Sequence, residues 1–119
     1  MKLNGYALLP LGFQLGFSGW WSSPFHWNPV AWVDFGRLFL EPRGSREGED
    51  NHQLDLQAGK VFRVGPTRLQ LIAAVYNLFS VEQPIFVCDD VDGCGEYELG
   101  EPTEWQLPRR YELGLRVEF

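Results

Sequence analysis

The sequence predicts an all-β fold, an antiparallel meander of about five strands. Three observations support this prediction. Apolar and polar residues alternate with a period of two in several segments, which is typical of strands whose two faces meet different environments. Gly (13 residues), Pro (8 residues) and aromatic residues (15%) are frequent, and this composition favours strands and defined turns over helices. The connections between the alternating segments run short, long, short, long.

We expect strands near residues 2–9, 11–21, 52–64, 67–79 and 107–119. The first segment, KLNGYALL, alternates least clearly. The second places one set of residues on a single face: Leu11, Phe13, Leu15, Phe17, Gly19 and Trp21. The third segment also places apolar residues on one face, and only Lys60 interrupts them: Leu54, Leu56, Ala58, Phe62 and Val64.

The last two strands alternate in the same way. One face of the fourth carries Leu69, Leu71, Ala73, Val75 and Phe79, opposite Arg68, Gln70, Ala74 and Tyr76. One face of the fifth carries Tyr111, Leu113, Leu115, Val117 and Phe119. This last strand keeps its pattern to the final aromatic residue, whereas most chain ends are frayed and polar.

The connections favour a membrane barrel over a soluble sheet. Tight turns are expected around Pro10 and at Gly65-Pro66, and long polar loops near 22–51 and 80–106. Short turns at one end and long loops at the other are typical of transmembrane β-barrels. Small residues on the face opposite the apolar one suit a polar lumen: Gly12, Gly16, Gly59 and Gly114. A soluble antiparallel sheet would also alternate, but it explains neither the loop lengths nor the terminal Phe119.

Size and charge narrow the functional classes. The 119 residues suffice for one domain with a modest core. A formal net charge of −6 argues against nucleic-acid binding, which needs clustered Lys and Arg. Neither a signal-peptide run nor an apolar stretch of about 18 residues is present, because Asn4, Pro10 and Gln14 interrupt the N-terminal segment.

The second long loop carries the chemically distinctive residues. Cys88 and Cys94 are too few to hold zinc, and we expect them to form a disulfide or, as the alternative, to remain two free thiols. A disulfide would place this loop in an oxidising compartment. A weak calcium candidate consists of Asp89, Asp90 and Asp92. In EF-hand register its twelfth position is Leu99, where a bidentate Glu is required, so no metal site is predicted.

The first long loop begins with an aromatic cluster, in GWWSSPFHW. Trp20, Trp21, Phe25 and Trp27 are candidates for contact with a ligand, by stacking on a sugar or anchoring a partner. The preferred interpretation assigns them to an interfacial belt, together with Trp105, Tyr111 and Phe119. His26 and His52 have no nucleophile placed beside them. No catalytic constellation is recognised, so we predict neither an enzyme nor a bound cofactor.

Several segments resemble one family. The closing residues ELGLRVEF resemble the C-terminal β-signal of bacterial outer-membrane barrels. LPLGFQLGFSGWWSSPFHW, the run from LEPRGSREGED to VYNLFS, and WQLPRRYELGLRVEF are similar to segments of TonB-dependent receptors, in order along nearly the whole chain. The PRGS variant resembles the subgroup with a carboxypeptidase-regulatory-like N-terminal domain. The cysteine loop has no counterpart in this pattern.

The resemblance implies a function and a setting. Receptors of this family form barrels of about 22 strands around a plug, in the outer membrane of Gram-negative bacteria, and import solutes with energy from TonB. About five strands would be a fragment of such a barrel. The implied partners are the rest of the barrel and plug, TonB through the missing N-terminal part, outer-membrane lipid, and the barrel-assembly machinery. The implied assembly signal comprises Tyr111, Glu112, Leu113, Gly114, Leu115, Val117 and Phe119. The alternative function is a small soluble β-sheet binding module that uses the aromatic loop residues.

Overall fold

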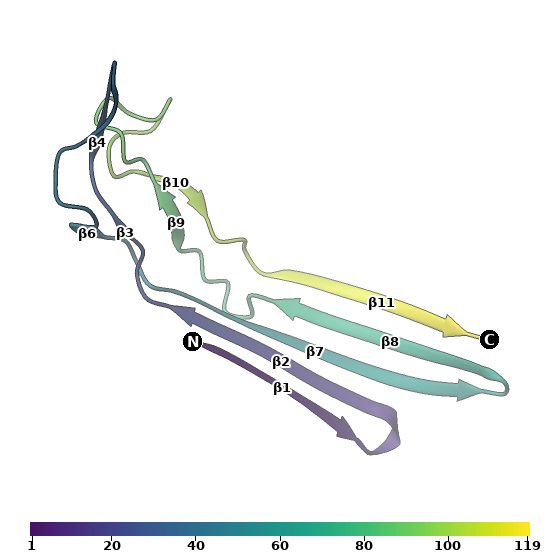
Figure 1. The fold of residues 1–119 in the computed structure, drawn as a ribbon. Helices are drawn as coiled ribbons and strands as arrows, with labels where there is room; N and C mark the ends of the chain where they lie inside the picture. Colours follow the sequence, from purple (N-terminus) through teal and green to yellow (C-terminus); the bar gives the residue numbers. More distant parts are fainter. The chain divides into compact units, whose positions relative to one another are not determined.

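The computed structural model describes all residues from 1 to 119 and is built from β-strands, with one short 3-10 turn. Its largest element is a five-stranded antiparallel sheet in the order β1-β2-β7-β8-β11. The all-β prediction and the antiparallel five-stranded sheet are confirmed (Figure 1). The strands are β1 (Lys2–Leu9), β2 (Phe13–Ser22), β7 (Asn51–Val64), β8 (Thr67–Tyr76) and β11 (Arg110–Glu118).

The strand register places the alternating residues on two opposite faces of this sheet. Leu56 lies opposite Val75, and Val75 lies opposite Tyr111, so one apolar row crosses three strands. In the same way Leu9 lies opposite Phe13. We call this side the apolar face. Its larger members are Leu3, Leu9, Phe13, Leu15, Phe17, Leu56, Phe62, Val64, Leu69, Leu71, Val75, Tyr111, Leu113, Leu115 and Val117.

The opposite side, the polar face, carries most of the hydrogen-bonding side chains. Its polar members are Lys2, Asn4, Gln14, Ser18, Asp55, Gln57, Arg63, Arg68, Gln70, Tyr76, Arg110, Glu112, Arg116 and Glu118. The separation is not complete. Leu8, Trp20, Val61 and Ile72 lie on the polar face, and Lys60 lies on the apolar face.

Turns fix where these strands begin and end. Gly65 and Pro66 connect β7 to β8 as a two-residue turn, and Gly65 has the positive φ (+61°) that glycine adopts without steric cost. The second strand begins at Phe13 rather than near 11, because Pro10–Gly12 forms the 3-10 turn and Leu11 has a φ of +63°. The fourth strand ends at Tyr76 rather than near 79, because Asn77 also has a positive φ.

The two long connections contain strands that the sequence analysis did not predict. Three short antiparallel ribbons form there. The first connection holds β3 (His26–Trp27) with β6 (Arg46–Glu47), and β4 (Val30–Val33) with β5 (Gly36–Phe39). The second holds β9 (Pro84–Val87) with β10 (Pro102–Trp105).

The chain divides into two compact units. The sheet unit comprises Met1–Trp21, His52–Val81 and Pro108–Phe119; the loop unit comprises Ser22–Asn51 and Glu82–Leu107. Inside the loop unit the two connections contact each other. Val30 bonds through its backbone to Asp89 (2.7 Å, N to O), and Val91 bonds back to Val30 (3.0 Å). The side chains of Val30 and Cys88 are each only 1% exposed and form the centre of this unit.

Candidate functional site: a sheet with two different faces

The apolar face of the sheet unit is not covered by any other element. Leu15 is 46% exposed, Leu71 48%, Leu115 65% and Leu113 86%. In the whole chain the buried apolar side chains are those of Pro29, Val30, Ala74 and Cys88, and Ala74 lies on the polar face. Soluble monomers rarely leave so continuous an apolar surface in water. This face therefore leaves a continuous apolar surface exposed in the chain.

Small residues make a shallow groove on this face. Its volume is about 670 Å³, and its floor includes Gly5, Ala7, Ala58 and Ala73. The one charged side chain on the face, Lys60, places its ammonium 4.0 Å from the centre of the Phe13 ring and 5.1 Å from that of Phe62. A Lys whose stem lies along apolar surface while its charge contacts aromatic rings is tolerated beside an apolar medium.

The polar face is held by side-chain hydrogen bonds that cross strands. Ser18 donates to Asn4 (2.8 Å), Gln70 donates to Gln14 across β7 (3.2 Å), and Tyr76 donates to Glu112 (3.1 Å). The middle bond passes beside Gly59: a Cβ there would lie 3.5 Å from the oxygen of Gln14, in ordinary van der Waals contact. A polar groove of about 310 Å³ lies on this face, lined by Asn4, Tyr6, Ser18, Asp55, Gln57 and Tyr76 among others.

The C-terminal strand has one paired and one unpaired edge. Every residue of β11 from Arg110 to Glu118 pairs with β8, and β11 has no neighbour on its other side. The sequence-predicted assembly residues divide between the faces: Tyr111, Leu113, Leu115 and Val117 are apolar-facing, while Glu112 and Gly114 are polar-facing. Phe119 follows the strand and is fully exposed. An edge of this kind can accept another strand by backbone pairing.

The structure does not gather the aromatic loop residues into one site. Trp20 and Trp21 are consecutive in β2 and therefore point to opposite faces. Phe25 and Trp27 belong to the loop unit. There the Trp27 ring lies 5.2 Å from the guanidinium of Arg46. This contact gives Trp27 a structural neighbour within the loop unit.

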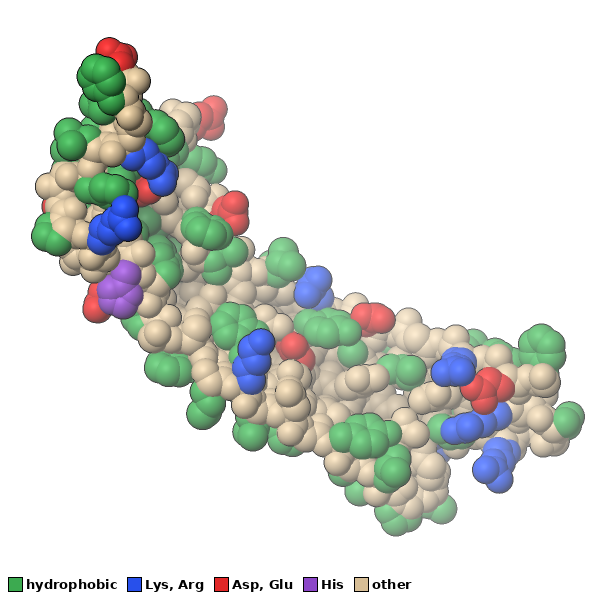
Figure 2. Space-filling view, viewed as in Figure 1, with side chains coloured by type: hydrophobic (Ala, Val, Ile, Leu, Met, Phe, Trp, Pro, Cys, Tyr) green, Lys and Arg blue, Asp and Glu red, His purple; other side chains and the backbone are tan.

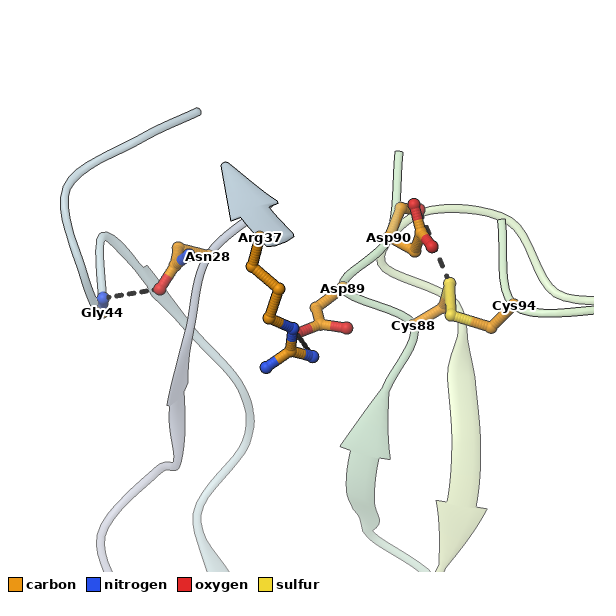
Figure 3. Close-up of polar contacts among 7 residues, drawn as sticks. All are labelled: Asn28, Arg37, Gly44, Cys88, Asp89, Asp90 and Cys94. Atoms are coloured by element: carbon orange, nitrogen blue, oxygen red, sulfur yellow. Dashed lines mark hydrogen bonds and ion pairs between the residues drawn. A yellow bond between two sulfur atoms is a disulfide. The ribbon is translucent and has the colours of Figure 1, made fainter. Parts of the chain in front are cut away.

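In the loop unit the cysteines are joined to each other. Cys88 and Cys94 form a disulfide, and Arg37 of β5 lies 3.6 Å from the carboxylate of Asp89 (Figure 3). The Asp90 carboxylate accepts a bond from the backbone N–H of Asp92 (3.1 Å). No group of three or more His, Cys, Asp or Glu side chains is placed to hold a metal ion, so the three aspartates do not assemble the calcium candidate.

The two histidines lie in different units of the chain. His26 Nε2 lies 3.2 Å from the Glu47 carboxylate in an exposed pair, and His52 lies in β7. No helix in the chain has the length and apolar character that crossing a membrane would require.

One organising residue was missed by the sequence analysis. Asn77 is 2% exposed and ends β8: its side-chain amide donates to the Val81 carbonyl (2.8 Å) and accepts from the Val81 N–H (3.0 Å). Its backbone N–H donates to the carboxylate of Asp55 on β7 (2.9 Å). An Asn just after an alternating segment was the available signal, because Asn tolerates a positive φ and bonds local backbone.

Comparison with family models, curated proteins and solved structures finds no match to this chain. The resemblance to TonB-dependent receptors therefore stays a prediction.

Proposed function

We propose that this chain forms part of the wall of an outer-membrane β-barrel, in a TonB-dependent receptor of a Gram-negative bacterium. The single observation that supports this most strongly is the exposed apolar face of a sheet whose other face is polar. In such a barrel the apolar side chains contact lipid and the polar side chains line the lumen. The strands of 8 to 14 residues suit a tilted crossing of the bilayer.

The connections between the strands fit the same proposed barrel. Because the sheet is an antiparallel meander, both turns leave one end of the strands and both long connections leave the other end. Barrels of this kind have short turns on the periplasmic side and longer loops outside. The disulfide-containing loop unit then lies on the oxidising exterior, where disulfides persist.

Strands β1 and β11 lie at the two ends of the sheet, and each leaves one edge unpaired. An unsatisfied backbone group in lipid costs several kcal/mol, and the smallest bacterial barrels have about eight strands. We therefore assign further strands to both edges and treat these five as the closing part of a larger receptor. The rest of the receptor would supply the other strands, the plug and the contact with TonB, and β11 would be the strand that the assembly machinery captures.

The lipid-facing assignment can be tested by spin labelling. Single cysteines at positions 69 to 75, labelled with a nitroxide in liposome-reconstituted protein, should alternate in their contact with quenchers. Odd positions on the apolar face should respond to oxygen, which concentrates in lipid, and even positions to a water-soluble nickel complex. Uniform response to nickel along the strand would contradict the proposal. So would a chain that stays monomeric and folded in water without detergent, as a soluble binding module would.

A further inference from the structure

The turn end of the polar face carries an excess of positive charge. Arg63 on β7 lies directly opposite Arg68 on β8, the last but one pair before the turn. Like charges facing each other across two strands destabilise a sheet. Figure 2 shows basic side chains gathered beside one acidic group at this end. A chain with a net charge of −6 nevertheless places two guanidinium groups at one register position.

The neighbouring carboxylate does not balance this pair. Glu118 lies 2.9 Å from Arg116 and 3.7 Å from Arg68. It is therefore held more closely by Arg116, and Arg68 has only the longer contact with it. The side chain of Arg68 remains 51% exposed.

The two arginines border a defined hollow. It has a volume of about 400 Å³ and is lined by Arg63, Arg68, Gln14 and Val61 together with the turn residues Leu11 and Gly12. Two features hold its walls in place. Gln14 is tied to Gln70 by a hydrogen bond, and the turn packs so closely on β7 that a Cβ on Gly12 would lie 2.8 Å from the Val61 carbonyl oxygen. The Gln14 and Gly12 side of the hollow is thus held in place by contacts within the sheet unit.

We infer that this hollow is an oxyanion-binding site, in which Arg63 and Arg68 together bind a phosphate or carboxylate group. A planar guanidinium donates two parallel hydrogen bonds to such a group. An anion between the arginines would accept charge-assisted hydrogen bonds from both guanidinium groups and offset the like charges of this cross-strand pair. The amide of Gln14 lines the same hollow and fixes its third side. The site depends on the sheet alone and stands whether or not the sheet lies in a membrane.

The test is protection of arginines from phenylglyoxal, which modifies exposed guanidinium groups. The full chain is refolded in a non-ionic detergent, treated with the reagent, and each arginine is quantified by peptide mass spectrometry. With about 10 mM inorganic phosphate and a dissociation constant of about 1 mM, modification of Arg63 and Arg68 should slow about tenfold. Arg110, on the same face at the other end of the sheet, should react at an unchanged rate. A parallel sample with a dicarboxylate distinguishes the two anion classes by the stronger protection.

Variants complete the test. Arg63→Gln should abolish the phosphate protection of Arg68, whereas Arg110→Gln should leave it unchanged. Equal protection of all arginines, or none in a sample with the circular dichroism of a β-sheet protein, would overturn the site. Absence of any strand signal would overturn the sheet and the site with it, so failure of the site alone remains distinguishable.

Discussion

At the scale of single residues, the most deeply buried polar residue, Asn77, lies where a strand ends. Asn77 is buried at the end of β8 and bonds both backbone groups of Val81, while Asp55 accepts its backbone N–H. A buried amide with its hydrogen bonds made is tolerated, but groups left without partners are costly. Asn77 therefore fixes the place where the chain leaves the sheet for the second long connection.

Replacing Asn77 with Ala should destabilise the chain by about 2–3 kcal/mol, because the bonds to Val81 are lost and its backbone groups are left without these partners. The measurement is urea unfolding in detergent micelles, followed by Trp fluorescence. Asn4→Ala is the control: Asn4 is exposed and accepts one bond from Ser18, so about 1 kcal/mol or less is expected. Equal losses in the two variants would contradict this role for Asn77.

A second residue-scale prediction concerns Glu41 in the loop unit. The hydrogen bonds from Arg46 (2.7 and 3.2 Å), and then that from Ser45 (2.7 Å), hold the pKa of the Glu41 carboxyl below its ordinary value. A lowered pKa in the folded chain means that this contact stabilises above the unfolded-state pKa and is lost as the pH falls through the folded-state pKa. NMR titration of the Glu41 carboxyl carbon should show its midpoint rising in Arg46→Gln. Ser45→Ala should raise it less, and an unchanged midpoint in Arg46→Gln would refute the assigned cause.

At the scale of elements, the same strands carry two different surfaces, and this difference can be measured by substitution. Leu71 lies on the apolar face between Lys60 and Leu115, and Ile72 lies on the polar face between Gly59 and Gly114. The two neighbours in sequence thus have the same strand position but opposite surroundings. Leu71 and Ile72 are therefore a matched pair for testing the proposed lipid-facing side of the sheet.

If the proposed barrel assignment holds, Leu71→Arg should destabilise the chain in lipid bilayers by about 2–4 kcal/mol at a position near the midplane. Ile72→Arg should then cost much less, because the flanking glycines leave room and its face would line a wet lumen. Denaturant unfolding from liposomes measures both. In the opposite result, with Ile72→Arg the more costly change, the lipid-facing and lumen-facing sides would have to be exchanged.

The strands could be predicted from the sequence because their apolar residues recur every second position, and successive side chains of a strand point to opposite faces of the sheet. Their ends were predicted less well. Alternation continues through Leu11 and Phe79, yet both lie outside the strands, since backbone turns at Leu11 and Asn77 override the pattern. The ribbons of the long connections were missed because their strands have only two to four residues, and β9 and β10 are far apart in sequence.

The group of Arg63, Arg68 and Gln14 on the polar face shows the same limit of prediction from sequence. The sequence indicates that Arg63 and Arg68 flank a turn, but only the register places them directly opposite each other. The position of Gln14 beside them depends on the pairing of β2 with β7 across a long connection. Local patterns predict faces; contacts between distant strands need the folded chain.

At the scale of the whole molecule, the two units are stabilised by different means. The sheet unit buries one apolar side chain, that of Ala74. It is held together by backbone pairing between its five strands. The loop unit has its own small core of Val30 and the Cys88–Cys94 disulfide, with backbone bonds between its two connections. Because each unit has separate stabilising contacts, damage to one should leave the other intact.

The double variant Cys88→Ser/Cys94→Ser tests this independence. Removing the cross-link and its buried sulfur should weaken the loop unit by about 2 kcal/mol, the value expected for a short disulfide-closed loop. Amide hydrogen exchange should then accelerate in residues 22–51 and 82–107, while β8 and β11 exchange as before.

Val30→Ala should accelerate exchange in the same segments, because it opens a cavity in the same core. Val33→Ala, at an exposed position of β4, should change little. Exchange that rises equally across the sheet would mean that the loop unit also holds the strands together.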